Sequence, residues 1–140
     1  MRTALVLGGA ACVWRDAAAA LDLGPFDVVT GCNDIGTAWP GAFDGWASLH
    51  PDKFNLWTAR RSAKLPPHKA RYARLEFAKD ADAVPTSFTF PGQAASGSSG
   101  LFALKIALVD LGCDKAVVCG APLPASAPMT VLSILPGNWK

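Results

Sequence analysis

Histidine, tyrosine and closely paired cysteines are scarce in this sequence. It contains two histidines, one tyrosine and four cysteines among 140 residues. The cysteines are Cys12, Cys32, Cys113 and Cys119, and no two of them form a C-x-x-C pair. A closed zinc site needs four soft ligands in paired spacings, so we expect no metal and no other cofactor. We expect buried, reduced thiols, as in cytoplasmic proteins.

Long hydrophobic runs and a strong net charge are also absent. No stretch approaches the ~20 apolar residues of a membrane-spanning helix, so we expect no membrane partner. The apolar run after Arg2 is short and meets Trp14-Arg15-Asp16 at once, which argues against a secretion signal. The formal net charge is +2, which gives no reason to expect a nucleic-acid partner. These numbers leave homo-oligomer formation open.

Apolar residues are plentiful, at 51% of the chain against 17% charged residues. This balance excludes intrinsic disorder, which needs low hydrophobicity and high net charge. A chain of 140 residues is also long enough to build a core of its own. We therefore expect residues 1–140 to form a single domain.

Apolar runs alternate with helical patterns along the chain. The predicted strands are 4–7, 26–30, 45–49, 70–77, 116–119 and 130–135. The predicted helices are 14–23, 51–65 and 99–111, and a loop rich in Pro, Gly, Ser and Thr is predicted at 83–99. Such alternation is typical of a parallel sheet with helices on both faces. The sequence thus predicts an α/β fold, a single Rossmann-like three-layer domain with a mostly parallel sheet.

Five loops should reach the carboxyl edge of this sheet, where open α/β sheets bind ligands. They carry Gly8-Gly9-Ala10, Asn33-Asp34, His50, Ser98-Ser99-Gly100 and Gly120. Each of these segments alone is weak evidence for a ligand site, and their expected position at the same edge is the argument for one. We expect Gly9, Asn33, His50 and Ser99 to line one cleft.

Glycine and serine in these loops suit a phosphate. Gly8 and Gly9 allow close approach of the backbone to a phosphate or sugar, although they form neither G-x-G-x-x-G nor a P-loop. A tight turn without a ligand explains them equally well. Ser98 or Ser99 is expected to cap the buried helix, whose free N–H groups favour an anion. Simple capping is the alternative.

The other loop residues suit a base, a sugar or proton transfer. Asn33 offers a donor and an acceptor to a base or sugar edge, and Asp34 a carboxylate to a ribose hydroxyl; an Asx turn is the alternative. His50 is the candidate catalytic acid/base, with a structural hydrogen bond as the alternative. His68 is expected to be solvent-exposed and without function.

Basic residues cluster in the second third of the chain. Residues 53–79 hold eight of the thirteen Lys and Arg residues and one acid, Glu76. Lys53, Arg60 and Lys64 share a helical face that either meets phosphates or is simply solvated. Among the five tryptophans, Trp39 is the candidate for a base-stacking platform or a lid.

Segments 98–112 and 115–120 resemble a bacterial family of sialyltransferase-like and hydroxymethylpterin diphosphokinase-like proteins. They show a Ser-Ser-Gly helix start, a Leu-Gly stop and a strand that ends in glycine. The segment Ala47-Ser48-Leu49-His50-Pro51-Asp52-Lys53 is similar to small phage or prophage proteins. The resemblance implies a Rossmann-like fold and a cytidine-nucleotide site around Gly8, Gly9, Asn33 and the 98–100 loop. The chain lacks the family's acid after the last strand and its lid histidine, which puts transfer in doubt.

Taken together, the sequence predicts a nucleotide or nucleotide-sugar binding protein. Whether it is an enzyme is left open; as one, it would be a nucleotide-sugar-dependent glycosyl or phosphoryl transferase. Catalysis would then be lost or altered relative to the family. The alternative is a phage structural, assembly or interaction protein with no small-molecule ligand.

Overall fold

The structure, a computed structural model, describes residues 1–93, 98–120 and 130–133. Its strands are β1 (Thr3–Leu7), β2 (Val28–Cys32), β3 (Gly45–Ala47), β4 (Ala70–Ala73), β5 (Val84–Pro85), β6 (Lys115–Cys119) and β7 (Thr130–Ser133). Its α-helices are α1 (Val13–Leu21), α2 (Phe54–Ser62) and α3 (Ser99–Lys105). Two 3₁₀ helices, η1 (Asn33–Thr37) and η2 (Pro51–Lys53), and a π turn, η3 (Ile106–Asp110), complete the order.

All strands join one sheet in the order β5-β4-β3-β2-β1-β6-β7. Every neighbouring pair is parallel except β6 and β7, which are antiparallel. The chain moves outward from β1 to β5 and then crosses back to place β6 on the other side of β1. The predicted mostly parallel, Rossmann-like sheet is confirmed, and the strand order reverses between β1 and β6.

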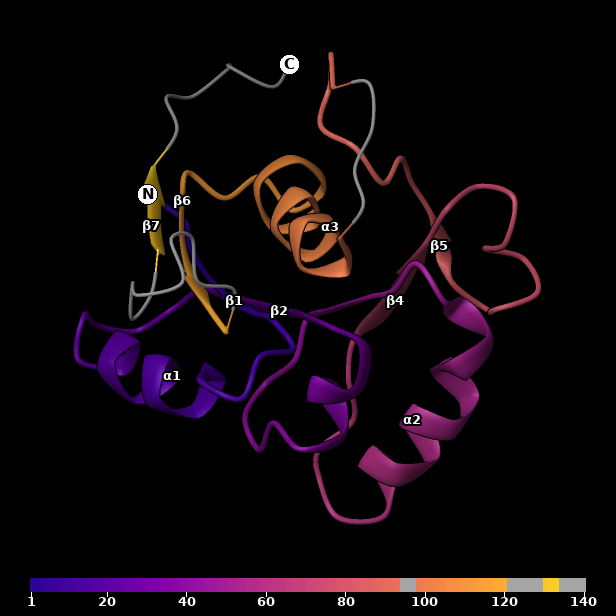
Figure 1. The fold of residues 1–140 in the computed structure, drawn as a ribbon, viewed down its shortest axis with the longest axis horizontal. Coiled ribbons are helices and arrows are strands. Elements are labelled where there is room, and N and C mark those ends of the chain that lie inside the picture. The colour runs from indigo at the N-terminus through magenta and orange to yellow at the C-terminus, as the bar shows by residue number, and fades with distance from the viewer. Residues whose placement is uncertain (94–97, 121–129, 134–140) are drawn as a thin grey trace.

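Helices cover both faces of the sheet and bury a separate apolar cluster on each (Figure 1). On one face α3 and η3 pack Phe102, Ile106 and neighbouring residues against alternate residues of β1, β2 and β6. On the other face α1 and α2 pack against the remaining alternate residues, with Trp46 fully buried among them. Strands buried on both sides must be apolar throughout, which explains the continuous apolar runs of the sequence.

The structure corrects several predicted boundaries. The strand at 70–77 ends at Ala73, and a turn follows it. The predicted loop at 83–99 contains the two-residue edge strand β5, which pairs with β4. The predicted helix at 51–65 begins as the 3₁₀ helix η2 and ends as an α-helix at Ser62. Residues 134 and 135 of the last predicted strand lie outside the described residues.

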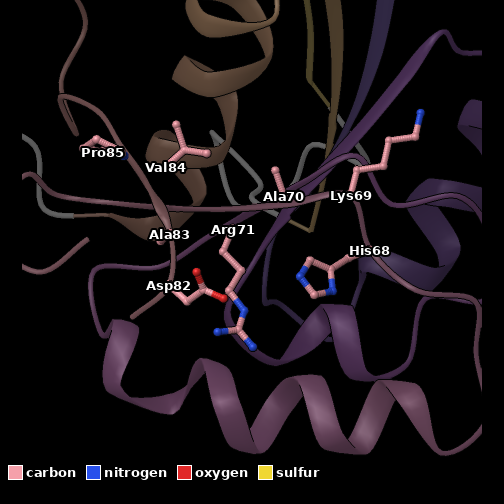
Figure 2. A pocket seen from close by; sticks show the side chains of 8 residues that line it. All are labelled: His68, Lys69, Ala70, Arg71, Asp82, Ala83, Val84 and Pro85. Atoms are coloured by element: carbon pink, nitrogen blue, oxygen red, sulfur yellow. The ribbon is translucent and has the colours of Figure 1, made fainter. Parts of the chain in front are cut away.

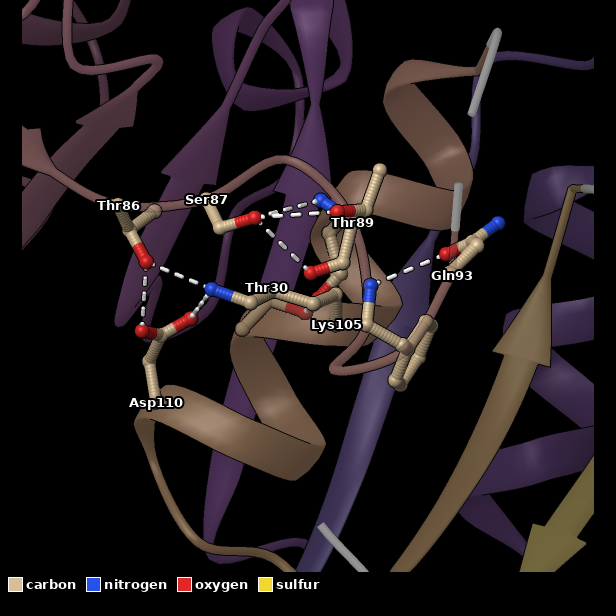
Figure 3. Close-up of polar contacts among 9 residues, drawn as sticks. Thr30, Thr86, Ser87, Thr89, Gln93, Lys105 and Asp110 are labelled. Carbon is tan, nitrogen blue, oxygen red and sulfur yellow. Dashed lines mark hydrogen bonds and ion pairs between the residues drawn. The ribbon is translucent and has the colours of Figure 1, made fainter. Parts of the chain in front are cut away.

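The predicted helix at 99–111 ends in a π turn that holds a partly buried ion pair (Figure 3). Leu111 N donates to Ile106 O, five residues back, which brings residues five apart together. Lys105 Nζ lies 2.7 Å from Asp110 Oδ2 and donates to Thr86 Oγ1 at 2.6 Å. Thr86 Oγ1 in turn donates to the other Asp110 oxygen at 2.8 Å. These contacts fasten the segment after β5 to α3.

Two further sequence expectations can be compared with the structure. All four cysteines carry free thiols, and Cys32, Cys113 and Cys119 are buried. Within the described part of the chain, no helix has the length and apolar character needed to cross a membrane.

Candidate functional site

A hollow of about 270 Å³ lies at the carboxyl edge of the sheet, beyond β2 and β3. Asn33, Asp34, His50, Lys53 and Trp57 line it. Asn33 and Asp34 begin η1 directly after β2, and His50 follows β3 by three residues. The carboxyl ends of parallel strands lie at one edge of the sheet. The loops after β2 and β3 therefore meet the N-terminal end of α2 here.

Asn33 is held in place by its own backbone and by two neighbours. Its φ is +54°, in the left-handed region that Asn adopts more readily than most residues. Trp46 Nε1 donates to the Asn33 carbonyl at 2.6 Å. Ser48 Oγ donates to Asn33 Oδ1 at 2.8 Å. The side-chain oxygen is therefore occupied, and no described residue bonds the amide nitrogen.

Ser48 also connects this residue to the loop that carries His50. Its Oγ accepts from the His50 backbone N–H at 2.8 Å while it donates to Asn33. One residue along, Leu49 N donates to Ser99 Oγ at 3.2 Å. The loops after β2 and β3 and the start of α3 thus form one hydrogen-bonded assembly. Asn33, His50 and Ser99 are thus brought to one edge of the sheet. The prediction that Gly9, Asn33, His50 and Ser99 line one cleft is not met by this hollow, because only Asn33 and His50 of the four line it.

The polar groups that face the hollow are unpaired. Among the described residues, no hydrogen bond or ion pair engages the Asn33 amide nitrogen, the Asp34 carboxylate, the His50 ring or the Lys53 ammonium. Beneath them the Trp57 ring is nearly buried. An amide, a carboxylate, an imidazole and an ammonium around one space supply donors, acceptors and a positive charge to a polar ligand.

The turn that carries Asn33 and Asp34 is held from behind by a buried arginine. Arg61 is fully buried and donates to the carbonyls of Gly36, Trp39 and Gly41 at 2.9, 2.6 and 3.0 Å. Its guanidinium also lies over the Phe43 ring. Burial lowers the pKa of Arg61 from its usual value. No signal in the sequence separates Arg61 from its exposed neighbour Arg60, so its role was not predicted.

Gly36 leaves the space into which Trp46 packs beneath the same turn. A Cβ at residue 36 would lie 2.5 Å from two Trp46 ring carbons and 2.8 Å from the Phe43 ring. We expect Gly36→Ala to lower the free energy of unfolding by about 2 kcal/mol, because both rings are locked in the core. Urea denaturation followed by fluorescence measures it. Gly9→Ala is the matched control, since its Cβ meets nothing within 4 Å; equal losses would contradict this packing.

The loops after β1 and β6 join each other where the strand order reverses. Gly8 N donates to Cys119 O, and Ala10 N donates to Gly120 O. The buried carboxylate of Asp16 accepts from Gly120 N at 2.9 Å. Asp16 therefore takes a backbone N–H that an anion would otherwise use. None of Gly8, Gly9, Ala10 or Gly120 lines the hollow beside His50, and residues 121–129 lie outside the described residues.

The serines at the start of α3 behave as the sequence predicts. Ser98 is the N-cap, and its Oγ accepts from Leu101 N at 3.3 Å. Ser99 is the first helical residue, and Gly100 follows it. Both hydroxyl oxygens accept a backbone hydrogen bond, and each O–H is left to donate. Neither serine lines the hollow beside His50, and residues 94–97 lie outside the described residues.

Two sequence expectations about aromatic side chains are wrong. Trp39 is not a free platform or lid: it is 8% exposed, stacks on Trp14, and donates from Nε1 to Ala42 O. His68 is not solvent-exposed: it is half-buried with its ring edge-on to Trp46. Burial, then Arg71 and Arg61, lower the pKa of His68. Both rings are fixed by partners distant in sequence.

Two larger hollows lie near the same strands. One of about 500 Å³ shares His50 with the candidate site and is also lined by Leu49, Asn55 and Phe77. The other, of about 510 Å³, lies where β4 and β5 begin, at the opposite edge, and His68, Arg71 and Asp82 contribute to it (Figure 2). Arg71 already donates to Asn55, Thr58 and Ala81, so it stabilises the loop before β5.

The buried thiols are unsuited to nucleophilic chemistry. Burial, with a smaller effect of Asp34, raises the pKa of Cys32 to about 11. Burial raises the pKa of Cys119 to about 12. A thiol with such a pKa stays protonated at neutral pH, and the thiolate is the reactive form. His50 is therefore the better candidate for proton transfer at this edge.

No family model, curated protein or solved structure matches this chain. A fold of this class hosts many unrelated activities, so the function has to be inferred from the site.

Proposed function

We propose that the hollow beside His50 binds a nucleotide or a nucleotide sugar. The observation that carries the proposal is the set of four unpaired polar side chains around one space of about 270 Å³. The ammonium of Lys53 suits a phosphate, and the Asp34 carboxylate suits the hydroxyls of a ribose. The Asn33 amide nitrogen would donate to a base or sugar acceptor. The resemblance to sialyltransferase-like proteins implies the same ligand class, although of the residues it implies only Asn33 lines this hollow.

His50 is the residue through which binding would become catalysis. Its ring has no hydrogen-bond partner among the described residues, and it lines both the 270 Å³ hollow and the neighbouring 500 Å³ hollow. A group that faces two spaces can move a proton between a nucleotide leaving group and an acceptor. The class of reaction would be glycosyl or phosphoryl transfer.

Calorimetry with nucleoside 5′-monophosphates and nucleotide sugars tests the binding. We expect micromolar affinity for at least one of them, about −8 kcal/mol. Lys53→Glu should raise its Kd at least about tenfold, because a charged hydrogen bond worth roughly 1.5–3 kcal/mol is replaced by repulsion. Lys115→Glu is the matched control, since Lys115 begins β6 at the opposite edge of the sheet.

The outcome of this titration is decisive for the hollow. No heat with any of these ligands at millimolar concentration would contradict the proposal. An equal Kd in wild type and Lys53→Glu would contradict the position of the phosphate.

One observation favours a second candidate, an interaction or assembly role without a small ligand. The outer face of α1 exposes large apolar side chains: Trp14 is 47% exposed and Leu21, two turns later, 55%. Ala18 lies between them on the same face and is also exposed. Exposed apolar patches mark contact surfaces in many proteins. If the protein binds none of the nucleotides, the interaction or assembly role would be favoured over nucleotide binding.

A further inference from the structure

The exposed side of α2 carries positive charge that is not offset by acids. Lys53, Arg60 and Lys64 are all exposed, and none of them forms an ion pair with a described residue. Beneath them the buried Arg61 has carbonyl oxygens as partners instead of carboxylates. We refer to Lys53, Arg60 and Lys64 as the α2 basic face.

The chain segments around this face contain few acids. Residues 53–75 include no Asp or Glu, and residues 35–43, part of which packs against α2 in η1, include none either. Four acids flank these two segments in sequence. Asp34 and Asp52 lie at the Lys53 end, and Asp44 and Glu76 pair with Lys69 and Arg74. The net charge of the whole chain is only +2, but positive charge is concentrated on this one surface. Such a surface attracts a polyanion.

The three cations form a row that begins at the candidate site. Lys53 ends η2, Arg60 lies in α2 seven residues later, and Lys64 follows by another four residues in the turn after α2. At 1.5 Å per residue the row is about 16 Å long. Its first member, Lys53, lines the hollow beside His50. If one end of a long ligand binds in the hollow, the rest of the ligand can lie along this row of cations.

We infer that the α2 basic face binds the phosphates of a single-stranded oligonucleotide whose terminal nucleotide occupies the hollow. The inference rests on the proposed nucleotide site and extends its ligand from a monomer to a chain. A hollow of about 270 Å³ suits one unpaired nucleotide, which favours a single strand over a duplex. A membrane surface fits less well, because Leu56 is the one large apolar side chain exposed among the described residues of α2 and interfacial helices need a broad apolar face.

Fluorescence anisotropy with a labelled pentanucleotide, compared with calorimetry on the mononucleotide of the same base, tests this. We expect the pentanucleotide to bind at least about tenfold more tightly at 50 mM salt. The two phosphates beyond the hollow should add about −1.4 to the salt slope of the mononucleotide, so a rise from 50 to about 200 mM salt weakens pentanucleotide binding roughly sevenfold more than mononucleotide binding. The variant Arg60→Glu/Lys64→Glu should lose the tenfold gain and keep the mononucleotide affinity within twofold.

The matched control is Arg2→Glu/Lys115→Glu, which changes the net charge equally at the amino edge of the sheet. Equal loss of pentanucleotide affinity in both double variants would overturn the inference, because net charge alone would then explain it. Mononucleotide binding without a gain from length would also overturn it and leave the hollow intact. Pentanucleotide binding through Arg60 and Lys64 without any mononucleotide binding would support the face and contradict the hollow. Sedimentation with anionic vesicles in place of oligonucleotide binding would overturn the inference in favour of a membrane.

Discussion

Replacing Arg61 by methionine is expected to lower the free energy of unfolding by about 3–5 kcal/mol, because three hydrogen bonds from a charged donor are lost. The guanidinium is fully buried and donates hydrogen bonds to the backbone carbonyls of Gly36, Trp39 and Gly41. Methionine has a similar length and no donor, so three carbonyl oxygens would be left without these bonds in a dry interior. Urea denaturation followed by tryptophan fluorescence measures the loss.

The adjacent arginine provides a control on the same helix. Arg60 is exposed, so Arg60→Met should change the free energy of unfolding by less than about 0.5 kcal/mol. Similar losses in the two variants would contradict the structural role given to Arg61. Because Arg61 supports the turn that begins at Asn33, its replacement should also weaken nucleotide binding in whatever fraction of the protein stays folded.

Lys105→Met is expected to lower the free energy of unfolding by about 2 kcal/mol, because hydrogen bonds of a charged group are lost. The ammonium is buried and contacts Asp110 and Thr86 at 2.7 and 2.6 Å. Without it, a carboxylate that is 23% exposed keeps its charge but loses its cation. The segment after β5 would also lose its fastening to α3 (Figure 3).

A double variant separates the ion pair from the packing of the methylene chain. Lys105→Met/Asp110→Leu removes both charges and should be more stable than Lys105→Met alone, because no unpaired carboxylate is left. Denaturation of the two variants and of wild type gives the coupling energy. Losses that simply add would show that Lys105 and Asp110 do not stabilise each other.

Sequence patterns were sufficient for the central strands of the sheet and for its carboxyl edge, but the edge strand β5 lies in a predicted loop. The runs at 4–7 and 116–119 are continuous and apolar because both faces of the central strands are buried, and that property is visible without a structure. Ser98 and Ser99 were correctly predicted at a helix start, since a cap is a local signal. Asn33 and His50 were predicted at the carboxyl edge because each follows a strand.

Long-range contacts decide what the sequence could not predict. Arg61 accompanies Arg60 in an ordinary basic helix, and its burial depends on carbonyls 20 to 25 residues earlier. The position of Lys53 in the candidate site could not be predicted either, because it depends on the packing of α2 against the turn that carries Asn33. The inward placement of Trp39 and His68 depends in the same way on Trp14 and Trp46. Such contacts leave no periodic trace in a single sequence.

The most direct test of the central claim is a ¹H–¹⁵N correlation spectrum of the protein titrated with the nucleotide that calorimetry selects. Binding in the hollow should move the backbone signals of Asn33, Asp34, His50 and Lys53 and the indole N–H signal of Trp57 together. The signals of Lys115 and of the residues around His68, at the opposite edge, should stay unchanged. Shifts confined to the loops after β1 and β6, or no shifts at saturating nucleotide, would contradict the site proposed beside His50.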